Sequence, residues 1–305
     1  MPASLNEVKR RISSTKKTAQ ITTAMQMVST SKLSRIQQHT GGYQDYISKI
    51  KLVMGHLLKS HLLNKNNVVN NDTNKISKWV KEDNDNKKIG LIVITSDRGL
   101  VGSYNSNVIK LANDFIKDSD DESKFSILAL GNNAIEFYNN RDLDISYTYR
   151  GINDTPNFSE VKSIVKNITK MYDDGKFSKL YVCYSHFVNR LTSKCKVEQI
   201  LPISEKNLKD MSNDDDVSYL PEYDIEPSPE VVFANLLPQY VESLLYGIIL
   251  DSKTSEHASS STAMKTASDN ANDLIDSLNL QYNRARQSAI TTEITEITGG
   301  QAALE

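Results

Sequence analysis

Several kinds of residue are scarce in this chain, and each scarcity narrows the class of protein. Only two of the 305 residues are cysteines, Cys183 and Cys195, so the sequence predicts a reducing compartment and no disulfide framework. Hydrophobic residues make up 38% of the chain, whereas the apolar share of compact domains, glycine included, is about half. We therefore expect part of the chain to be extended.

Long apolar runs are missing as well. The longest lie at residues 244–246 and 247–250, far short of the ~20 residues that a membrane span needs. No charged segment followed by an apolar one opens the chain, so no leader is expected. These absences predict a soluble protein, which could still be part of a membrane machine.

Motifs for catalysis and metal binding are also absent. No phosphate-binding G-x-x-x-x-G-K-[ST] loop occurs, since Gly175-Lys176 is followed by Phe177, and we do not expect the chain itself to hydrolyse ATP. His56 and His61 are five positions apart, on different faces of a helix, with no cysteine beside them. We predict no catalytic residue, no metal and no cofactor.

Charge is unevenly distributed, although the net charge is only -2. Residues 1–60 hold ten Lys/Arg and two Asp/Glu, and residues 239–305 hold four and nine, which gives +8 and -5 by subtraction. Ends of opposite sign can pair with each other. This pattern fits pairing better than nucleic-acid binding, which would leave the basic end unneutralised, and we predict no nucleic-acid partner.

Both ends of the chain have the spacing of long helices. From Leu5, Val8 and Ile12 one heptad register persists through residue 57, weakened at Gly41-Gly42. Ser228-Pro229-Glu230 is a good helix start, and after Pro238, where a kink is expected, no proline interrupts the sequence up to residue 298. The predicted C-terminal seam comprises Met264, Ser268, Ala271, Ile275, Leu278, Tyr282, Ala285 and Ala289. Its small residues favour an antiparallel partner helix, for which the N-terminal helix is the obvious candidate.

The middle of the chain changes period. Apolar runs at residues 88–95, 125–130 and 179–187 alternate with amphipathic stretches at 104–117, 132–139 and 159–172, which is typical of an α/β domain. The predicted fold is α/β: a long antiparallel two-helix coiled coil of the N- and C-terminal helices plus a central Rossmann-like α/β domain. The predicted segments are an N-terminal helix (1–60), a polar loop insertion (61–86), the α/β domain (87–203), an acidic loop and foot (204–228) and a C-terminal helix (229–305).

Two local features admit competing interpretations. Residues 96–105 follow a predicted strand and precede a helix, which suits an anion site, but Gly99 and Gly102 also serve an ordinary turn. Residues 18–31 contain no charge between strongly basic flanks, so this collar faces either other proteins or the chain's own α/β domain. Residues 257–262 (HASSST) are interpreted as a thin stretch of helix.

Three motifs carry a resemblance to a known family. They are ITTAMQMV at residues 21–28 with SKL at 31–33, TSDRGL at 95–100 with Tyr104-Asn105, and a C-terminal set comprising SEHA at 255–258, TAMK at 262–265, SDNA at 268–271 and LQYNRARQ at 280–287. In this order they resemble the γ subunit of bacterial-type F-type (rotary, proton-translocating) ATP synthase. The sequence departs from the family pattern at Val101-Gly102-Ser103, where Cys-Gly-Gly is common, and at residues 259–261, where Ala-Arg-Met is usual.

The resemblance implies a non-catalytic central rotor shaft that couples proton flow to the catalytic β subunits and regulates ATPase activity and proton flow. It implies α, β and ε subunits and the c-subunit ring as partners, membrane contact only through that complex, and a place at the cytoplasmic face of the cell membrane. By resemblance, residues that contact β are Met25, Arg286, Gln287, Thr291 and Glu293, and those of the foot at the c ring and ε are Tyr223 and Glu226. The alternatives are a coiled-coil adaptor with an α/β head and a ligand-binding module at residues 96–105.

Overall fold

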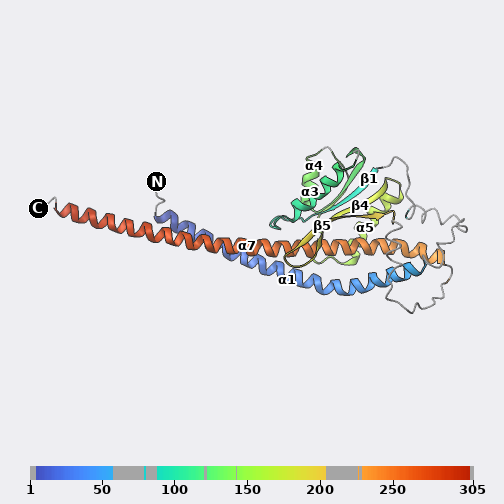
Figure 1. Cartoon of the computed structure of the whole chain (residues 1–305), viewed down its shortest axis with the longest axis horizontal. Helices are drawn as coiled ribbons and strands as arrows, with labels where there is room; N and C mark the ends of the chain where they lie inside the picture. The colour runs from blue at the N-terminus through green and yellow to red at the C-terminus, as the bar shows by residue number, and fades with distance from the viewer. Residues whose placement is uncertain are drawn as a thin grey trace. The chain divides into compact units, whose positions relative to one another are not determined.

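The computed structural model describes residues 5–57, 79, 88–119, 122–141, 143–203, 226 and 229–302. Two long helices, α1 (Leu5–Leu57) and α7 (Pro229–Ala302), come first and last in the chain (Figure 1). The expected weak points do not end either helix, because α1 continues through Gly41-Gly42 and α7 continues through Pro238. Among the described residues, no helix is both long and apolar enough to cross a membrane.

A five-stranded sheet lies between the two helices in sequence. Its strands have the order β3-β2-β1-β4-β5, and every neighbouring pair is parallel except β4 with β5, which is antiparallel. The elements are β1 (Lys88–Ile94), α3 (Tyr104–Lys117), η2 (Glu122–Lys124), β2 (Phe125–Leu130), α4 (Asn132–Asn139), β3 (Asp144–Tyr149), α5 (Phe158–Asp173), β4 (Phe177–Phe187) and β5 (Ser193–Leu201). The predicted α/β class is confirmed, whereas the two edge strands β3 and β5 were not predicted.

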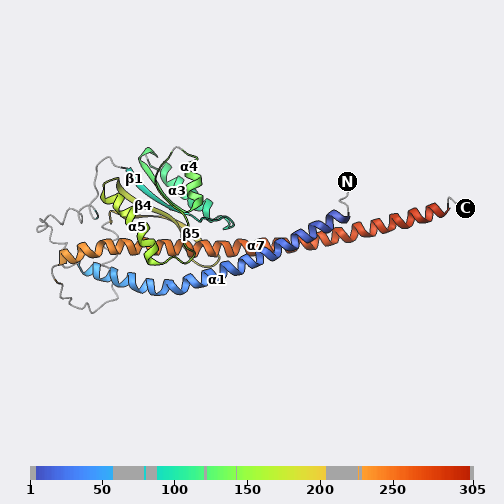
Figure 2. The ribbon, with the colours of Figure 1, turned by 180° about the vertical axis from the view of Figure 1, so that it is seen from behind.

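The sheet buries apolar side chains on both faces. Because side chains alternate along a strand, Leu91 and Val93 of β1 join a first core with residues of α3 and α4, whereas Ile92 and Ile94 join a second core with residues of α5. Figure 2 shows these helices beside the strands. The second core also takes in side chains of both long helices: Ile50 and Met54 of α1 and Leu237, Tyr240, Val241, Leu245, Ile248 and Ile249 of α7. These parts of α1 and α7 are therefore built into the α/β core.

The chain divides into two compact units, and the boundary between them crosses both long helices. Unit 1 contains Met1–Thr30 and Ser260–Glu305, and unit 2 contains Ser31–Ser259. Within unit 1, side-chain oxygens of Thr23 and Ser268 lie 2.8 Å apart, and those of Ser29 and Ser260 lie 3.1 Å apart. Since the partner number falls as the α1 number rises, the two helical segments run antiparallel.

Most of the two polar runs, 61–86 and 204–228, lies outside the described residues, as do His61 and the side chain of His56. The exception in the first run is Trp79, the only tryptophan of the chain, which is buried. Its indole Nε1 donates to Asp173 Oδ1 at 2.7 Å, and its carbonyl accepts from the amide of Ile203 at 2.8 Å. The predicted polar insertion therefore contains one apolar anchor on the α/β core.

Candidate functional site

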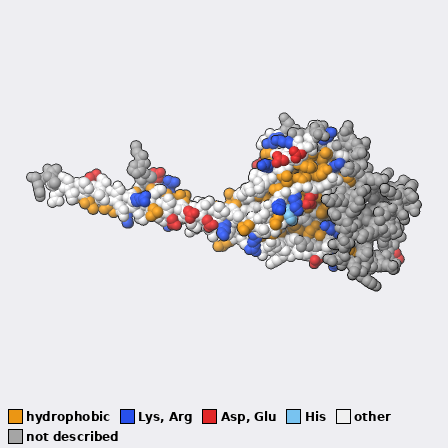
Figure 3. Space-filling view, viewed as in Figure 1, with side chains coloured by type: hydrophobic (Ala, Val, Ile, Leu, Met, Phe, Trp, Pro, Cys, Tyr) orange, Lys and Arg blue, Asp and Glu red, His pale blue; other side chains and the backbone are white. Residues whose placement is uncertain are grey.

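The last turns of α7 expose every described side chain. No residue from 286 to 301 is buried or half-buried, and Ile297 is 65% exposed. The hydroxyls of Thr291, Thr295 and Thr298 donate to the backbone carbonyls four residues earlier, at 2.7–2.9 Å. These hydroxyl donors are satisfied within the helix. The tip therefore presents isolated isoleucines among threonine hydroxyls that are already hydrogen-bonded. Figure 3 shows the side chains at this end of the molecule by type.

The residues expected to contact β divide between two places in unit 1. Arg286, Gln287, Thr291 and Glu293 all lie on the exposed tip of α7. Met25 is exposed on α1, close to the Thr23–Ser268 contact. Met25 lies near the level of Ser268, and position 286, where the tip begins, is 18 residues further along α7. Because each helical residue adds about 1.5 Å, Met25 lies ~27 Å along the helix axis from the start of the tip. The structure does not bring the five residues together.

The uncharged collar of α1, residues 18–31, is exposed on one side. Ile21, Val28 and Met27 are exposed, Met27 to 66%, whereas Ala19 and Ser29 are buried. All but the last residue of this segment belong to unit 1 rather than to the unit that contains the sheet. The exposed side of the collar therefore carries apolar side chains and no charge.

The seam residues have graded burial. Val8, Ala271 and Leu278 are buried, and Leu5, Ile12, Ile275 and Tyr282 are half-buried. Burial ends at Ala285, the last half-buried residue of α7, and Ala289 is exposed. In the register of the Thr23–Ser268 contact, Ala285 lies level with the start of α1, so the described partner helix ends there. Of the two foot residues, Tyr223 lies outside the described residues and Glu226 is exposed.

The turn at residues 96–105 satisfies its own polar groups. The carboxylate of Asp97 accepts the amide of Asn132 at 3.0 Å, at the start of α4, and the amide of Gly151 at 2.9 Å. Ser96 Oγ donates to the Arg98 carbonyl at 2.5 Å, and the Ser96 amide donates to the Asn105 side chain. Asp97 thus takes the place of an anion at the N-terminus of α4, whereas the predicted anion site lies at the start of α3, the helix that follows this turn.

α7 occupies the edge of the sheet where α/β domains commonly hold a ligand. That place lies outside the carboxyl ends of the strands, where the strand order reverses, here between β1 and β4. The hydroxyl of Tyr104, the first residue of α3, lies 2.6 Å from Ser252 Oγ of α7, and Ser185 Oγ of β4 lies 2.7 Å from Ser255 Oγ. Burial, with the Glu256 charge nearby, raises the pKa of Tyr104, so its hydroxyl stays protonated.

Asp251 adds a third polar contact between α7 and the α/β domain. Its carboxylate accepts the Phe187 amide at 2.9 Å and lies 2.6 Å from His186 Nδ1, both at the end of β4. Sequence reasoning missed these residues of α7. The available signal was the run DSKTSEH at 251–257, which has no large apolar side chain yet lies inside a helix whose preceding turns are strongly apolar. Its last residue, His257, was assigned to a thin stretch of helix, but it is buried.

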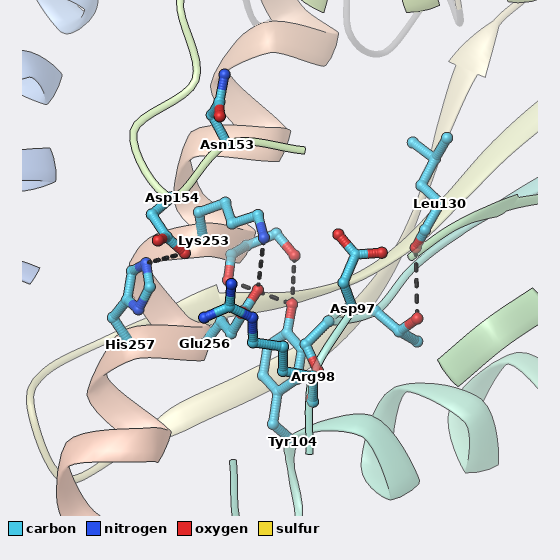
Figure 4. A network of polar contacts seen from close by, with 12 residues as sticks. Asp97, Arg98, Tyr104, Leu130, Asn153, Asp154, Lys253, Glu256 and His257 are labelled. Carbon is cyan, nitrogen blue, oxygen red and sulfur yellow. Dashed lines mark hydrogen bonds and ion pairs between the residues drawn. The ribbon is translucent and has the colours of Figure 1, made fainter. Parts of the chain in front are cut away.

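A group of charged residues lies beside this contact (Figure 4). Lys32 Nζ of α1 lies 2.6 Å from Asp154 Oδ2, and His257 Nε2 lies 3.7 Å from Asp154 Oδ1. Burial lowers the pKa of His257, while the charges of Glu256 and Asp154 act in the opposite direction. Desolvation raises the pKa of Asp154, but the hydrogen bond and charge of Lys32 outweigh it and hold that pKa below 3.8.

Known proteins resemble the chain over its full length. The family model described as ATP synthase matches residues 4–304. A protein of Lactiplantibacillus plantarum named ATP synthase gamma chain is 55% identical over 314 residues, which cover 100% of both chains. One of the same name from Ligilactobacillus salivarius is 55% identical over 310 residues, with the same coverage. The chain belongs to the ATP synthase gamma chain family.

Solved structures show the same fold. The rotor of the Euglena gracilis mitochondrial ATP synthase matches with a TM-score of 0.62 and 14% identity, covering 94% of this chain and 98% of that one. A chain of the Tetrahymena thermophila central stalk and c ring matches with a TM-score of 0.57 and 22% identity, covering 81% and 99%. The predicted membership of the gamma family is confirmed. A gamma chain is the central-stalk rotor subunit of ATP synthase and is non-catalytic, since the catalytic sites lie on beta subunits.

Proposed function

We propose that unit 1 of this gamma chain turns inside a ring of α and β subunits, and that unit 2 joins the ε subunit and the c-subunit ring at the cytoplasmic face of the cell membrane. The observation that supports this most directly is the exposed end of α7, where residues 286–301 carry no buried side chain. A helix end without a core of its own needs contacts with other protein chains, and the surrounding α and β subunits supply those contacts.

The chemistry of the tip suits a sliding contact. Ile290, Ile294 and Ile297 give small, separated apolar contacts, and the threonine hydroxyls beside them are already bonded to their own helix. Buried ion pairs or broad apolar patches would bind one orientation tightly, and the tip offers few of either. It therefore carries load without being trapped at one angle.

Torque transfer requires an asymmetric and stiff element. An antiparallel pair of helices has a non-circular cross-section, so its rotation pushes successive β subunits toward different nucleotide affinities. In this proposal Met25, Arg286, Gln287, Thr291 and Glu293 contact β-subunit loops. Tyr223 and Glu226 belong to the foot at the c ring and ε.

A cleavable crosslink at the tip tests this proposal. In a chain whose cysteines are replaced by serine, Thr291→Cys carries a photoactivatable, reducible crosslinker, and the variant is assembled into the complete membrane complex. Thr291 is exposed and its side chain bonds only its own helix, so we expect normal assembly. Light should join the chain to α or β and stop ATP-driven proton pumping, and reduction should restore pumping.

Lys166→Cys is the matched control, since Lys166 is exposed on α5 of unit 2. The crosslinker at position 166 should not join the chain to the α or β subunits that contact the tip. The purified chain should show no ATPase activity and should co-purify with α and β at one to three to three. Crosslinking of position 291 to a protein outside the ATPase, with pumping unaffected, would instead establish the adaptor function.

A further inference from the structure

Three segments of unit 2 meet at one carboxylate. Asp154, in the connection between β3 and α5, lies 2.6 Å from Lys32 Nζ of α1 and 3.7 Å from His257 Nε2 of α7. In Figure 4, the His257 ring and the Asp154 carboxylate point toward one another across the gap between α7 and that connection. Asp154 therefore ties the connection, residues 150–157, to α1 through Lys32 and lies beside His257 of α7.

The histidine of this group is buried, and its Nε2 lacks a hydrogen bond to any described residue. The His257 side chain is 6% exposed, and its Nε2 has no hydrogen-bond partner among the residues that the structure describes. A distance of 3.7 Å to Asp154 is too long for a hydrogen bond. A titratable nitrogen is thus buried without a described protein group that satisfies it.

The surrounding charges already balance. Lys32 faces His257 from α1, Asp154 faces it from the β3–α5 connection, and Lys253 and Glu256 flank it on α7. Lys253 Nζ and Glu256 Oε2 lie 3.0 Å apart as an ion pair, and the two side chains are 5% and 9% exposed. Lys32 and Asp154 are more accessible, at 30% and 42% exposed. Arg98, drawn beside them in Figure 4, is exposed. The two cations and two anions around His257 sum to zero, so protonation of His257 would place one unbalanced charge at a buried side chain.

We propose that Lys32, Asp154 and His257 form an acid-sensitive catch. The Lys32–Asp154 ion pair joins residues 150–157 to α1, the neutral His257 ring of α7 lies buried beside Asp154, and the catch loosens when His257 gains a proton, because the closed state buries that ring. The catch lies wholly within unit 2 and does not depend on any partner. In an assembled complex it would make the attachment between the α/β domain and the long helices weaker in acid.

The direction follows from the two states of the imidazole. In the closed state, burial holds the pKa of His257 below its ordinary value of 6.5, so closure favours the neutral ring. Its contribution is complete above pH 6.5 and declines as the pH falls below that value. The pKa of Asp154 is held below 3.8, so loss of its contribution begins only in more acid solution. The interval from pH 6.5 to 5.5 therefore reports on His257.

Hydrogen exchange of the full-length chain tests the proposal. Within residues 150–157, the Gly151 amide donates to Asp97 at 2.9 Å and the Asn153 amide donates to Glu160 Oε1 at 3.1 Å, so these two amides report on protection of the segment. After correction for intrinsic exchange, its protection should fall about fivefold from pH 6.5 to 5.5, the limit for one proton taken up only by the open state. Protection of β1 amides serves as the internal reference. Unchanged protection of residues 150–157 in the wild-type chain would overturn the proposal.

Two histidine variants identify the titrating group. His257→Gln keeps a polar side chain of similar size without a titration near neutrality, so the fall in protection should disappear. His186→Gln removes the histidine that lies 2.6 Å from Asp251 and should keep the wild-type fall. The same fall in His257→Gln as in wild type would show that another group is responsible. If His257→Gln does not fold, His257→Asn takes its place, and unchanged protection in the wild-type chain overturns the proposal in either case.

Discussion

The side-chain oxygens of Thr23 and Ser268 lie 2.8 Å apart, although 245 positions separate the two residues in the sequence. Ser29 with Ser260 and Thr30 with Ser261 repeat the arrangement about two turns away, at 3.1 and 2.9 Å. Residues 260 and 261 are two of the three positions at which the sequence is expected to depart from the family pattern. In this chain, their hydroxyls lie within hydrogen-bond distance of hydroxyls on α1.

Leu278→Asp should separate the helices of unit 1. Leu278 is 2% exposed, and an unpaired carboxylate at a buried position costs several kcal/mol. We expect the denaturation midpoint of the chain to fall and ATP-driven proton pumping to be lost while ATP hydrolysis persists. Leu280→Asp is the control, because Leu280 is 62% exposed on the same helix, and it should be nearly neutral. Equal effects of the two substitutions would contradict the predicted seam.

Gly247→Ala should destabilise unit 2, although alanine favours a helix. A Cβ at position 247 would lie 2.1 Å from the hydroxyl of Tyr43, and that hydroxyl is held by a 2.7 Å bond to the Ser243 carbonyl. Relief of the clash requires loss of this bond or a shift of α1, at about 1–3 kcal/mol. Gly299→Ala meets nothing within 4 Å and should stabilise its helix slightly. Thermal unfolding of the two variants should therefore shift in opposite directions.

The two long helices could be predicted because their signal is local. A heptad repeat places Val8, Ala271 and Leu278 on helix faces before any partner is known, and all three are buried. The central strands were predicted for a similar reason, since both faces of β1 and β2 are apolar. The edge strand β3 (Asp144–Tyr149) mixes polar and aromatic residues, because most of its side chains are only half-buried, and it had no such signal.

The polar contacts between α7 and the sheet could not be predicted from sequence. Tyr104 and Ser252 are 148 positions apart, and Ser185 and Ser255 are 70 apart, so neither spacing nor period relates them. The burial of Trp79 could not be predicted for another reason, because Trp79 lies in a run of residues whose composition is that of a loop. In both cases the stabilising partner belongs to another segment, and composition alone does not identify it.

Thiol reactivity should be slow in the folded chain. Cys183 is fully buried, and burial raises the pKa of its thiol. The half-buried Cys195 also has a raised pKa, for the same cause. Because the thiolate is the reactive form, a chromogenic disulfide reagent at pH 7.5 should label neither cysteine rapidly and both after denaturation. Ser193→Cys, at an exposed position of β5, should add one fast-reacting thiol. Rapid labelling of wild type would show that β4 and β5 open readily.

Tyr104→Phe should weaken the attachment of α7 to the sheet. The substitution removes a buried hydroxyl that lies 2.6 Å from Ser252 Oγ and leaves the serine without that partner, at about 1–2 kcal/mol of stability. Ser252→Ala should cost a similar amount, because the tyrosine hydroxyl then loses the same bond. The double variant should cost less than the sum, since the second substitution removes a group that has already lost its partner. Tyr46→Phe, at an exposed tyrosine of α1, should leave the unfolding midpoint nearly unchanged. Strict additivity of Tyr104→Phe and Ser252→Ala would show that the two hydroxyls do not share a bond that matters to stability, and that the apolar core alone holds α7 against the sheet.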